Sequence, residues 1–201
     1  MKQLMISLSR ETGSGGHKIA EALAQRFSLP LYDKNILTEI AESRDLDENL
    51  LRKYEETSKN RLLSRRIRGL SNSAQDGLAG MQFAFLRDKA ESGASFVVVG
   101  RCAEYALQAY PGLISLFISG DLDARLAYLQ SLYQFSESEA MDYLRKHDKN
   151  RSSYHNEYSP AKWGEADTYD LLINSSRLGI DGTIDFLEQY IRARIAKAEE
   201  A

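Results

Sequence analysis

The residues of this chain best suited to chemistry lie in "SRETGSGGHKIAEALA", residues 9 to 24, directly after a short apolar run. Gly13, Gly15 and Gly16 separate that run from a stretch whose apolar residues recur at helical spacing. Such a strand, turn and helix start direct backbone N–H groups and the positive end of the helix dipole at one point, which favours an anion. A tight turn that binds nothing is the alternative. Three glycines in four residues favour a phosphate site.

The loop departs from G-x-x-x-x-G-K-[ST], the sequence that binds nucleotide phosphates in many kinases. In that loop the lysine reaches the β- and γ-phosphates, and the hydroxyl meets Mg²⁺. Here Arg10 stands at the first glycine, Gly16 at the lysine and His17 at the Ser/Thr. Either His17 or Lys18 can supply the missing charge, or both face solvent. Because the N–H groups do not depend on side chains, we expect phosphate binding to persist, with weaker support for fast phosphoryl transfer.

Two further places combine positive charge with a position suited to phosphate. Arg101 directly follows the apolar run at 95–100, and open α/β sheets bind ligands at the carboxyl ends of their strands. Its guanidinium can hold a phosphate through two parallel hydrogen bonds, or lie at a helix start with no ligand. A second group of positive side chains consists of Arg145, Lys146, Lys149 and Arg151. From the residues alone, this group is a solvated helix end whose cations favour the C-terminal dipole.

Five short apolar runs must position these residues. The runs are residues 4–9, 31–32, 95–100, 113–119 and 169–175. Their length and their β-favouring residues predict buried strands. Because helical patterns separate them, we predict an α/β fold with a parallel sheet covered on both faces.

Helical patterns follow the glycine loop and recur at 121–133, at 136–147 and from 180 onward. Ser136 and Glu139 have the spacing of a capping box. Residues 44–92 are charged and helix-prone, which predicts two or more helices with a looser link at 69–80. The polar, aromatic stretch 148–167 is expected to be irregular.

The totals narrow the class of protein. The 201 residues are 43% hydrophobic and 27% charged, as in ordinary globular proteins. The net charge of −3 argues against a broad nucleic-acid-binding surface. With Cys102 as the one cysteine beside three histidines, we expect neither an internal disulfide nor a metal site. Since no secretory leader or membrane-length apolar run is found, we expect a cytoplasmic protein without nucleic-acid or membrane partners.

Four blocks of the sequence resemble the cytidylate kinase-like branch of the nucleoside monophosphate kinases. They are "ISLSRETGSGGHKIAEALAQRFSLPLYDKNIL", "VVVGRCAEYAL", "ISLFISGDLDARL" and "HDKNRSSYHNEYSPAKWGEADTYDLLINSSRLGIDGTIDFL". That family carries an S-R-x-x-G-S-G-G loop in place of the lysine-bearing one. The resemblance implies one P-loop NTPase-type domain over residues 1–201, a three-layer α/β/α fold with a five-stranded parallel sheet. Its parts would be a core (1–43, 93–147 and 168–201), a helical acceptor-binding region (44–92) and a lid (148–167).

The resemblance also implies roles for individual residues. Asp33 falls near the acceptor nucleotide of the family, and Arg101 falls on the arginine that contacts the acceptor phosphate. The aspartate of the family's G-R-D block is replaced here by Cys102. The donor phosphates would be held by Arg10, Thr12, Gly13, Ser14, Gly15, Gly16, His17 and Lys18. Catalytic charge would come from Lys18 and from Arg145, Lys149 and Arg151, with Arg151 first because we expect it to lie past the helix.

The expected activity is ATP- and Mg²⁺-dependent transfer of a phosphoryl group to a small acceptor, a nucleoside monophosphate such as CMP. The acceptor phosphate is already ionised, so positioning and electrostatics would suffice without a general base. The alternative is a nucleotide- or phosphate-binding regulator with little or no turnover, which Gly16 and Cys102 both favour. A kinase for a different small acceptor is a third reading. The sequence leaves homo-oligomerisation open.

Overall fold

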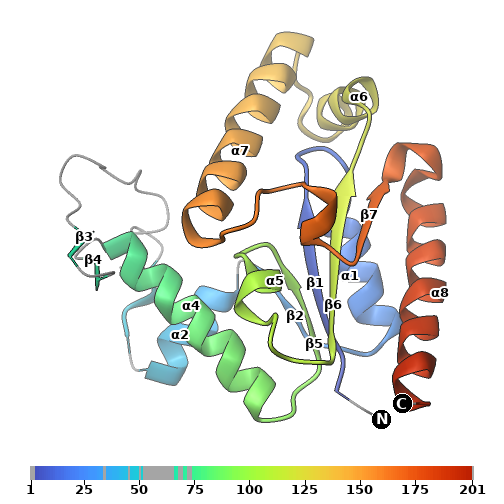
Figure 1. Cartoon of the computed structure of the whole chain (residues 1–201). Helices are drawn as coiled ribbons and strands as arrows, with labels where there is room; N and C mark the ends of the chain where they lie inside the picture. The colour runs from blue at the N-terminus through green and yellow to red at the C-terminus, as the bar shows by residue number, and fades with distance from the viewer. Residues whose placement is uncertain are drawn as a thin grey trace.

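The computed structural model describes residues 3–33, 35–44, 46–49, 51, 66–67, 70–71 and 74–200. Its centre is a five-stranded parallel sheet, as predicted, with the strand order β2-β5-β1-β6-β7. The strands fall on the five apolar runs and are β1 (Met5–Arg10), β2 (Leu31–Tyr32), β5 (Phe96–Val99), β6 (Leu113–Ser119) and β7 (Leu171–Asn174). Because β1 is central, the glycine loop that follows it opens in the middle of the sheet's carboxyl edge (Figure 1).

Helices cover both faces of this sheet and produce three layers (Figure 1). Successive residues of a strand point to opposite faces, so Ile6 and Leu8 pack on one side and Met5 on the other. The first side is covered by α1 (Gly16–Arg26) and α8 (Gly179–Glu199). The second side is covered by α2 (Ile36–Arg44), α4 (Ala74–Glu91) and α5 (Ala103–Ala106). The predicted α/β fold class is confirmed.

Two further helices, α6 (Leu122–Tyr133) and α7 (Glu137–Tyr158), lie beyond the carboxyl ends of the strands (Figure 1). They pack on each other through a small apolar cluster formed by Leu126, Leu129, Ala140 and Leu144. The predicted capping box starts α7, because the Ser136 hydroxyl accepts from the Glu139 N–H while the Glu139 carboxylate accepts from the Ser136 N–H. This helix pair forms a roof over the glycine loop.

The expectation of an irregular stretch over 148–167 is wrong for its first half, because α7 continues as a helix to Tyr158. Arg151 therefore lies within the helix and not past it. The reason is visible in the sequence: no glycine or proline interrupts the chain from Glu137 until Pro160, where the ring forbids a further helical turn. The polar composition of this stretch predicted a loop, but contacts with distant parts of the chain stabilise it as a helix.

The region 44–92 is described only in part. Residues 74–80, expected to form a looser link, belong instead to α4. A short antiparallel pair that was not predicted joins β3 (Arg66–Ile67) to β4 (Leu70–Ser71). The helices expected over 52–65 lie outside the described residues. Within the described ranges, no helix is both long and apolar enough to cross a membrane.

Candidate phosphoryl-transfer site

The glycine loop makes a tight connection between β1, which ends at Arg10, and α1, which begins at Gly16. Gly13 and Gly15 have φ angles of +81° and +74°, which side chains rarely adopt. A Cβ at Gly13 would lie 2.7 Å from the carbonyl oxygen of Arg125, and one at Gly15 would lie 2.7 Å from Cδ1 of Ile180. Both positions therefore require glycine.

The loop presents unpaired donors at the start of α1. Among the described residues, the N–H groups of Gly15, Gly16 and His17 donate to no acceptor. The first N–H groups of a helix have no partner inside the helix, and the helix dipole adds partial positive charge there. The strand, the glycine turn and the helix start therefore lie as the sequence predicted, and the binding of an anion there stays a prediction.

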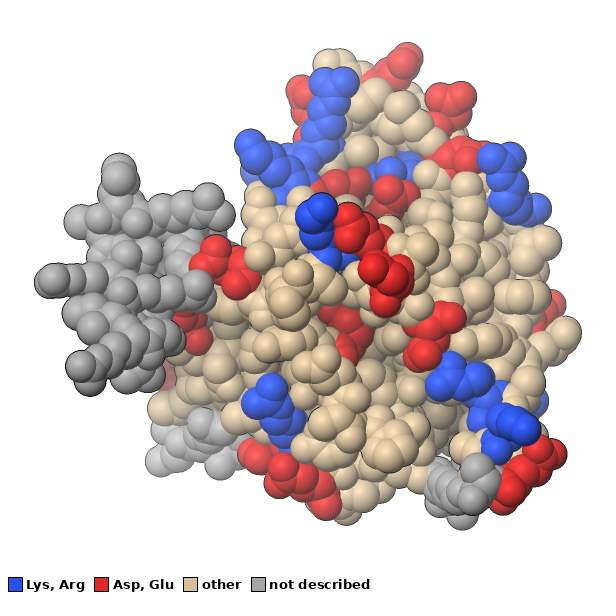
Figure 2. Space-filling view, in the orientation of Figure 1, with Lys and Arg blue, Asp and Glu red and all other residues tan. Residues whose placement is uncertain are grey.

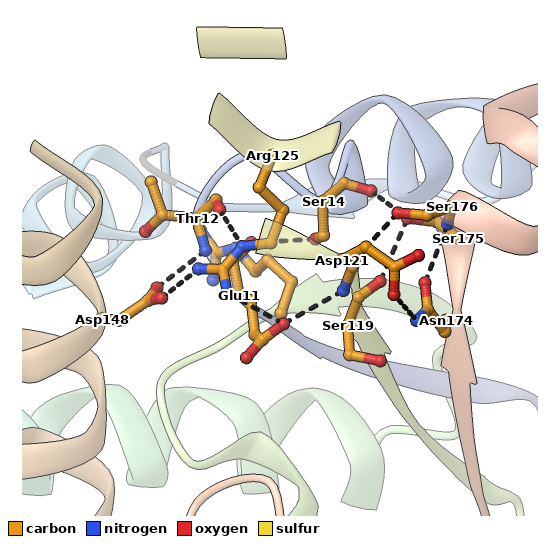
Figure 3. Close-up of polar contacts among 12 residues, drawn as sticks. Glu11, Thr12, Ser14, Ser119, Asp121, Arg125, Asp148, Asn174, Ser175 and Ser176 are labelled. Carbon is orange, nitrogen blue, oxygen red and sulfur yellow. Dashed lines mark hydrogen bonds and ion pairs between the residues drawn. The ribbon is translucent and has the colours of Figure 1, made fainter. Parts of the chain in front are cut away.

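Thr12 joins the loop to the roof helices through three contacts, of which Figure 3 shows those with Asp148 and Arg125. Its N–H donates to Oδ1 of Asp148 at 2.7 Å, and its carbonyl accepts from Nε of Arg125 at 2.7 Å. Its hydroxyl accepts from Nη1 of Arg151 at 2.9 Å. The loop is therefore clamped by α6 and α7 together.

The opposite side of the loop is held by Ser175, which follows β7 (Figure 3). Its hydroxyl lies 2.7 Å from the carbonyl oxygen of Ser14 and 3.0 Å from that of Ser119. The Ser14 hydroxyl in turn donates to the carbonyl of Glu11 at 2.8 Å. These bonds fix the loop backbone before any ligand arrives.

Arg125 is a buried cation whose charge is already balanced. Its Nη1 lies 3.2 Å from Oε2 of Glu11, and its Nη2 forms an ion pair with Oδ2 of Asp148. Neither Arg125 nor Asp148 was assigned a role from the sequence. Asp148 lies three residues before Arg151, which places the two on one face of a helix. This relation can be recognised only once α7 is known to extend through both residues. Arg125 carried no comparable signal.

A second group of cations lies around the end of β1. Arg10 lies at the end of β1, with Nη2 3.9 Å from Oδ1 of Asp33. Asp33 also lies 2.9 Å from Nδ1 of His17 through its other oxygen. The backbone carbonyl of Arg10 accepts from Nη1 of Arg151 at 3.3 Å. Arg101, which follows β5, is near enough to affect the charge of Arg10.

The pKa values of Arg10 and Arg151 reflect mainly the burial of these two charges. The pKa of Arg10 is lowered to about 9, first by burial and then by Arg151 and Arg101, while Asp33 acts in the opposite direction. Burial also lowers the pKa of Arg151. A guanidinium remains protonated at neutral pH, so these shifts express an energetic cost of holding the charges together. An anion bound among them would reduce that cost.

The remaining predicted cations lie elsewhere. Lys18 is exposed on α1, with Nζ 5.4 Å from the ring centre of Tyr128 on α6. Arg145 and Lys149 are exposed on α7. On the face of the molecule seen in Figure 2, acidic and basic side chains are interspersed. The structure therefore brings Arg10, Thr12, His17, Asp33 and Arg151 together, with Arg101 near Arg10. The binding and catalytic roles expected of these residues and of Lys18, Arg145 and Lys149 stay predictions.

A buried polar cluster that the sequence did not predict lies beside the site. Oε1 of Glu104 on α5 is 2.8 Å from Nε2 of His155 on α7, and both side chains are almost fully enclosed. The Cys102 thiol lies within 4.8 Å of these groups. Burial raises the pKa of Cys102, which keeps it a packed thiol. The cluster fastens the C-terminal part of α7 to the protein body.

Comparisons with known proteins agree with this geometry. Residues 5–177 match the sequence profile of the cytidylate kinase-like family. Among curated proteins no sequence matches the chain. An uncharacterized protein from Eubacterium ventriosum ATCC 27560 is 34% identical in sequence, with a TM-score of 0.75 over 94% of this chain and 99% of that one.

Two structural likenesses at lower identity concern the fold alone. Shikimate kinase from Bacteroides thetaiotaomicron is 15% identical, with a TM-score of 0.54 over 94% of this chain and 98% of that one. A gluconokinase from Sinorhizobium meliloti 1021 is 12% identical, with a TM-score of 0.52 over 98% of this chain and 94% of that one. The sheet, its covering helices and the loop after β1 are those of a P-loop kinase fold.

Proposed function

This chain belongs to the cytidylate kinase-like family, and from that membership and its site we propose that it transfers the γ-phosphoryl group of ATP to a nucleoside monophosphate such as CMP. The observation that carries the proposal is the juxtaposition at the sheet's carboxyl edge. The N–H groups of the glycine loop lie beside Arg10, Arg101 and Arg151, with Asp33 as the carboxylate paired to Arg10. Two phosphate-bearing reactants would bring negative charge to these cations.

The transfer breaks the bond between the γ-phosphorus and its bridging oxygen, and ADP leaves with that electron pair. A new bond forms between the γ-phosphorus and a phosphate oxygen of the acceptor. Negative charge spreads over the equatorial oxygens of the transferred group in between. In this proposal Arg10 and Arg151 stabilise that charge, and Arg101 holds the acceptor phosphate. The acceptor oxygen is already ionised, so no general base is needed.

The loop does not offer the usual side-chain ligand for Mg²⁺. Mg²⁺ prefers oxygen ligands in octahedral geometry, and the position of the loop hydroxyl is occupied by the imidazole of His17. The Asp33 carboxylate is engaged with His17 and Arg10. His17 and Asp33 therefore do not form a dedicated site for the ion, and Mg²⁺ would enter as part of the nucleotide complex.

The test is the release of ADP from ATP and Mg²⁺ with CMP, dCMP, UMP, AMP or no acceptor. We expect release to depend on one of the monophosphates and to fall about 100-fold in Arg151→Ala, since an arginine that contacts the transferred group stabilises the transition state. Arg192→Ala, an exposed arginine of α8, is the matched control. Acceptor-independent release, or none with any acceptor, would overturn the proposal.

A regulator that binds nucleotide without turning it over is the second candidate. Glycine in place of the motif's lysine at residue 16, and histidine in place of its Ser/Thr at residue 17, favour it. Saturable binding of ATP by calorimetry, without ADP formation against the same acceptors, would support the regulator over the kinase.

A further inference from the structure

We propose that the guanidinium of Arg10 takes the place of the missing loop lysine, and that Arg10 and Gly16 are therefore coupled positions. The inference rests on the proposed function in that the ligand is a nucleoside triphosphate. It goes further by assigning the group that meets the donor's terminal phosphates. It also explains why the position of the lysine is occupied by glycine.

The space above Gly16 is filled by Arg10. A Cβ built on Gly16 would lie 2.5 Å from Cβ and 2.8 Å from Cγ of Arg10, closer than real Cβ atoms approach. The nearer of these atoms is bonded directly to the backbone of β1, so it cannot swing away as the end of a flexible side chain can. A lysine at residue 16 would have to leave the helix along this occupied direction. Arg10 and a lysine at this position exclude each other.

The Arg10 side chain continues from Gly16 toward the ends of the neighbouring strands. A Cβ on Gly100, which follows β5, would lie 2.6 Å from Nη1 of Arg10. Nη2 lies 3.9 Å from Oδ1 of Asp33, which follows β2. Because neither Gly16 nor Gly100 has a side chain, the space beside both is open to the side chain of Arg10. The Arg10 side chain therefore begins beside the donor loop, and its guanidinium lies toward the side where Arg101 would hold the acceptor.

The charge of Arg10 is available to a ligand, unlike that of Arg125. Arg125 lies against both Glu11 and Asp148. Arg10 has Asp33 at the outer limit of an ion pair, and Asp33 is closer to His17. The adjacent Arg151 donates to the Arg10 carbonyl and to Thr12, which adds positive charge on the loop side. A terminal phosphate between these cations and the loop N–H groups would complete the balance.

The experiment is a double-variant cycle with Arg10→Gly, Gly16→Lys and the protein carrying both changes, which restores G-x-x-x-x-G-K at residues 10–16. Affinities for ATP and ADP with Mg²⁺ are measured by calorimetry, and folding by thermal unfolding. We expect Arg10→Gly to weaken ATP binding about tenfold or more, with a smaller effect on ADP, because the charged group meets the terminal phosphates. Arg192→Ala should change neither affinity.

The second half of the cycle separates a phosphate-binding role from a structural one. Gly16→Lys alone should lower the Tm, because its Cβ meets the Arg10 stem. The double variant should recover both the Tm and the affinity for ATP to within about threefold of wild type. A folded double variant that binds ATP no better than Arg10→Gly would overturn the assignment.

The assignment and the proposed function fail in different measurements. Wild-type protein that binds no ATP would overturn both. If wild-type protein binds ATP and the Arg10→Gly variant binds it with the same affinity, the assignment alone is overturned. If ATP binds and no acceptor is phosphorylated, the cycle on affinity still decides the role of Arg10.

Discussion

The carboxylate of Asp148 accepts a 2.7 Å hydrogen bond from the N–H of Thr12, so an acidic residue of α7 is bound to the backbone of the phosphate loop. The same carboxylate forms an ion pair with the buried Arg125. One side chain therefore stabilises a loop donor and a cation from a different helix. Its removal affects both.

Replacement of Asp148 by alanine should destabilise the fold. Arg125 would keep Glu11 but lose its closer partner, and the Thr12 N–H would lose its acceptor. We expect a loss of about 2 kcal/mol in the free energy of unfolding, measured by urea denaturation. Asp142→Ala, an exposed position on the same helix, should change it by less than about 0.5 kcal/mol. Equal stability of the two variants would contradict the assigned contacts.

Replacement of Arg101 by alanine should weaken acceptor binding selectively. Both residue types are equally strained at the observed φ of +61°, so the change removes the guanidinium without altering the demand on the backbone. We expect the KM for the acceptor to rise about tenfold and that for ATP to change less than about twofold, since the lost contact is charge-assisted. An unchanged acceptor KM in steady-state kinetics would remove Arg101 from the site.

His147 should titrate below its usual range. Its pKa is lowered first by burial and then by Arg151 and Lys146, while Asp148 acts in the opposite direction. As pH falls, the unfolded chain takes up this proton before the folded protein does. The contribution of His147 to the free energy of unfolding therefore decreases from about pH 6.5 down to the lowered pKa and is constant below it. Arg151→Met should raise the pKa of His147, as followed by NMR titration of the ring. No upward shift would show that Arg151 does not act on the ring.

The buried pair of Glu104 and His155 should be strongly coupled. Removing one partner leaves the other enclosed without compensation, which costs about 3 kcal/mol in comparable sites. Glu104→Ala and His155→Ala should each lower stability by about that amount, and the double variant by clearly less than their sum. Strict additivity in chemical denaturation would mean that the two side chains do not interact.

The strands and the glycine loop were predictable because local patterns determine them. Short β-favouring runs such as 95–100 become buried parallel strands, and Gly13 and Gly15 adopt φ angles that other residues avoid. The extent of α7 was missed, because the contacts that hold Asp148 and His155 come from distant parts of the chain. Propensity alone does not reveal them.

The candidate site was predictable where a residue adjoins a strand end. Arg10, Asp33 and Arg101 each follow or end a strand, and parallel strands place such residues on one edge of the sheet. The steric exclusion between Arg10 and a side chain at residue 16 required coordinates, because five loop residues separate the two positions in the sequence. The buried charge balance of Arg125 required them for the same reason.

The helix α7 is attached to the rest of the protein at two points, His155 and Asp148, which lie at different distances from its start. His155 is fixed to the body by Glu104, and Asp148 holds the loop about 10 Å nearer the start of the helix, at 1.5 Å of rise per residue. Glu137, where α7 begins, lies about 27 Å from His155 by the same rise. If the hydrogen bond to Thr12 breaks while the contact of His155 with Glu104 is kept, α7 can rotate about His155. Such a rotation displaces Glu137 more than twice as far as it displaces Asp148. Because α6 packs on that far end, a small change at the phosphate loop would be magnified at the outer surface of the roof.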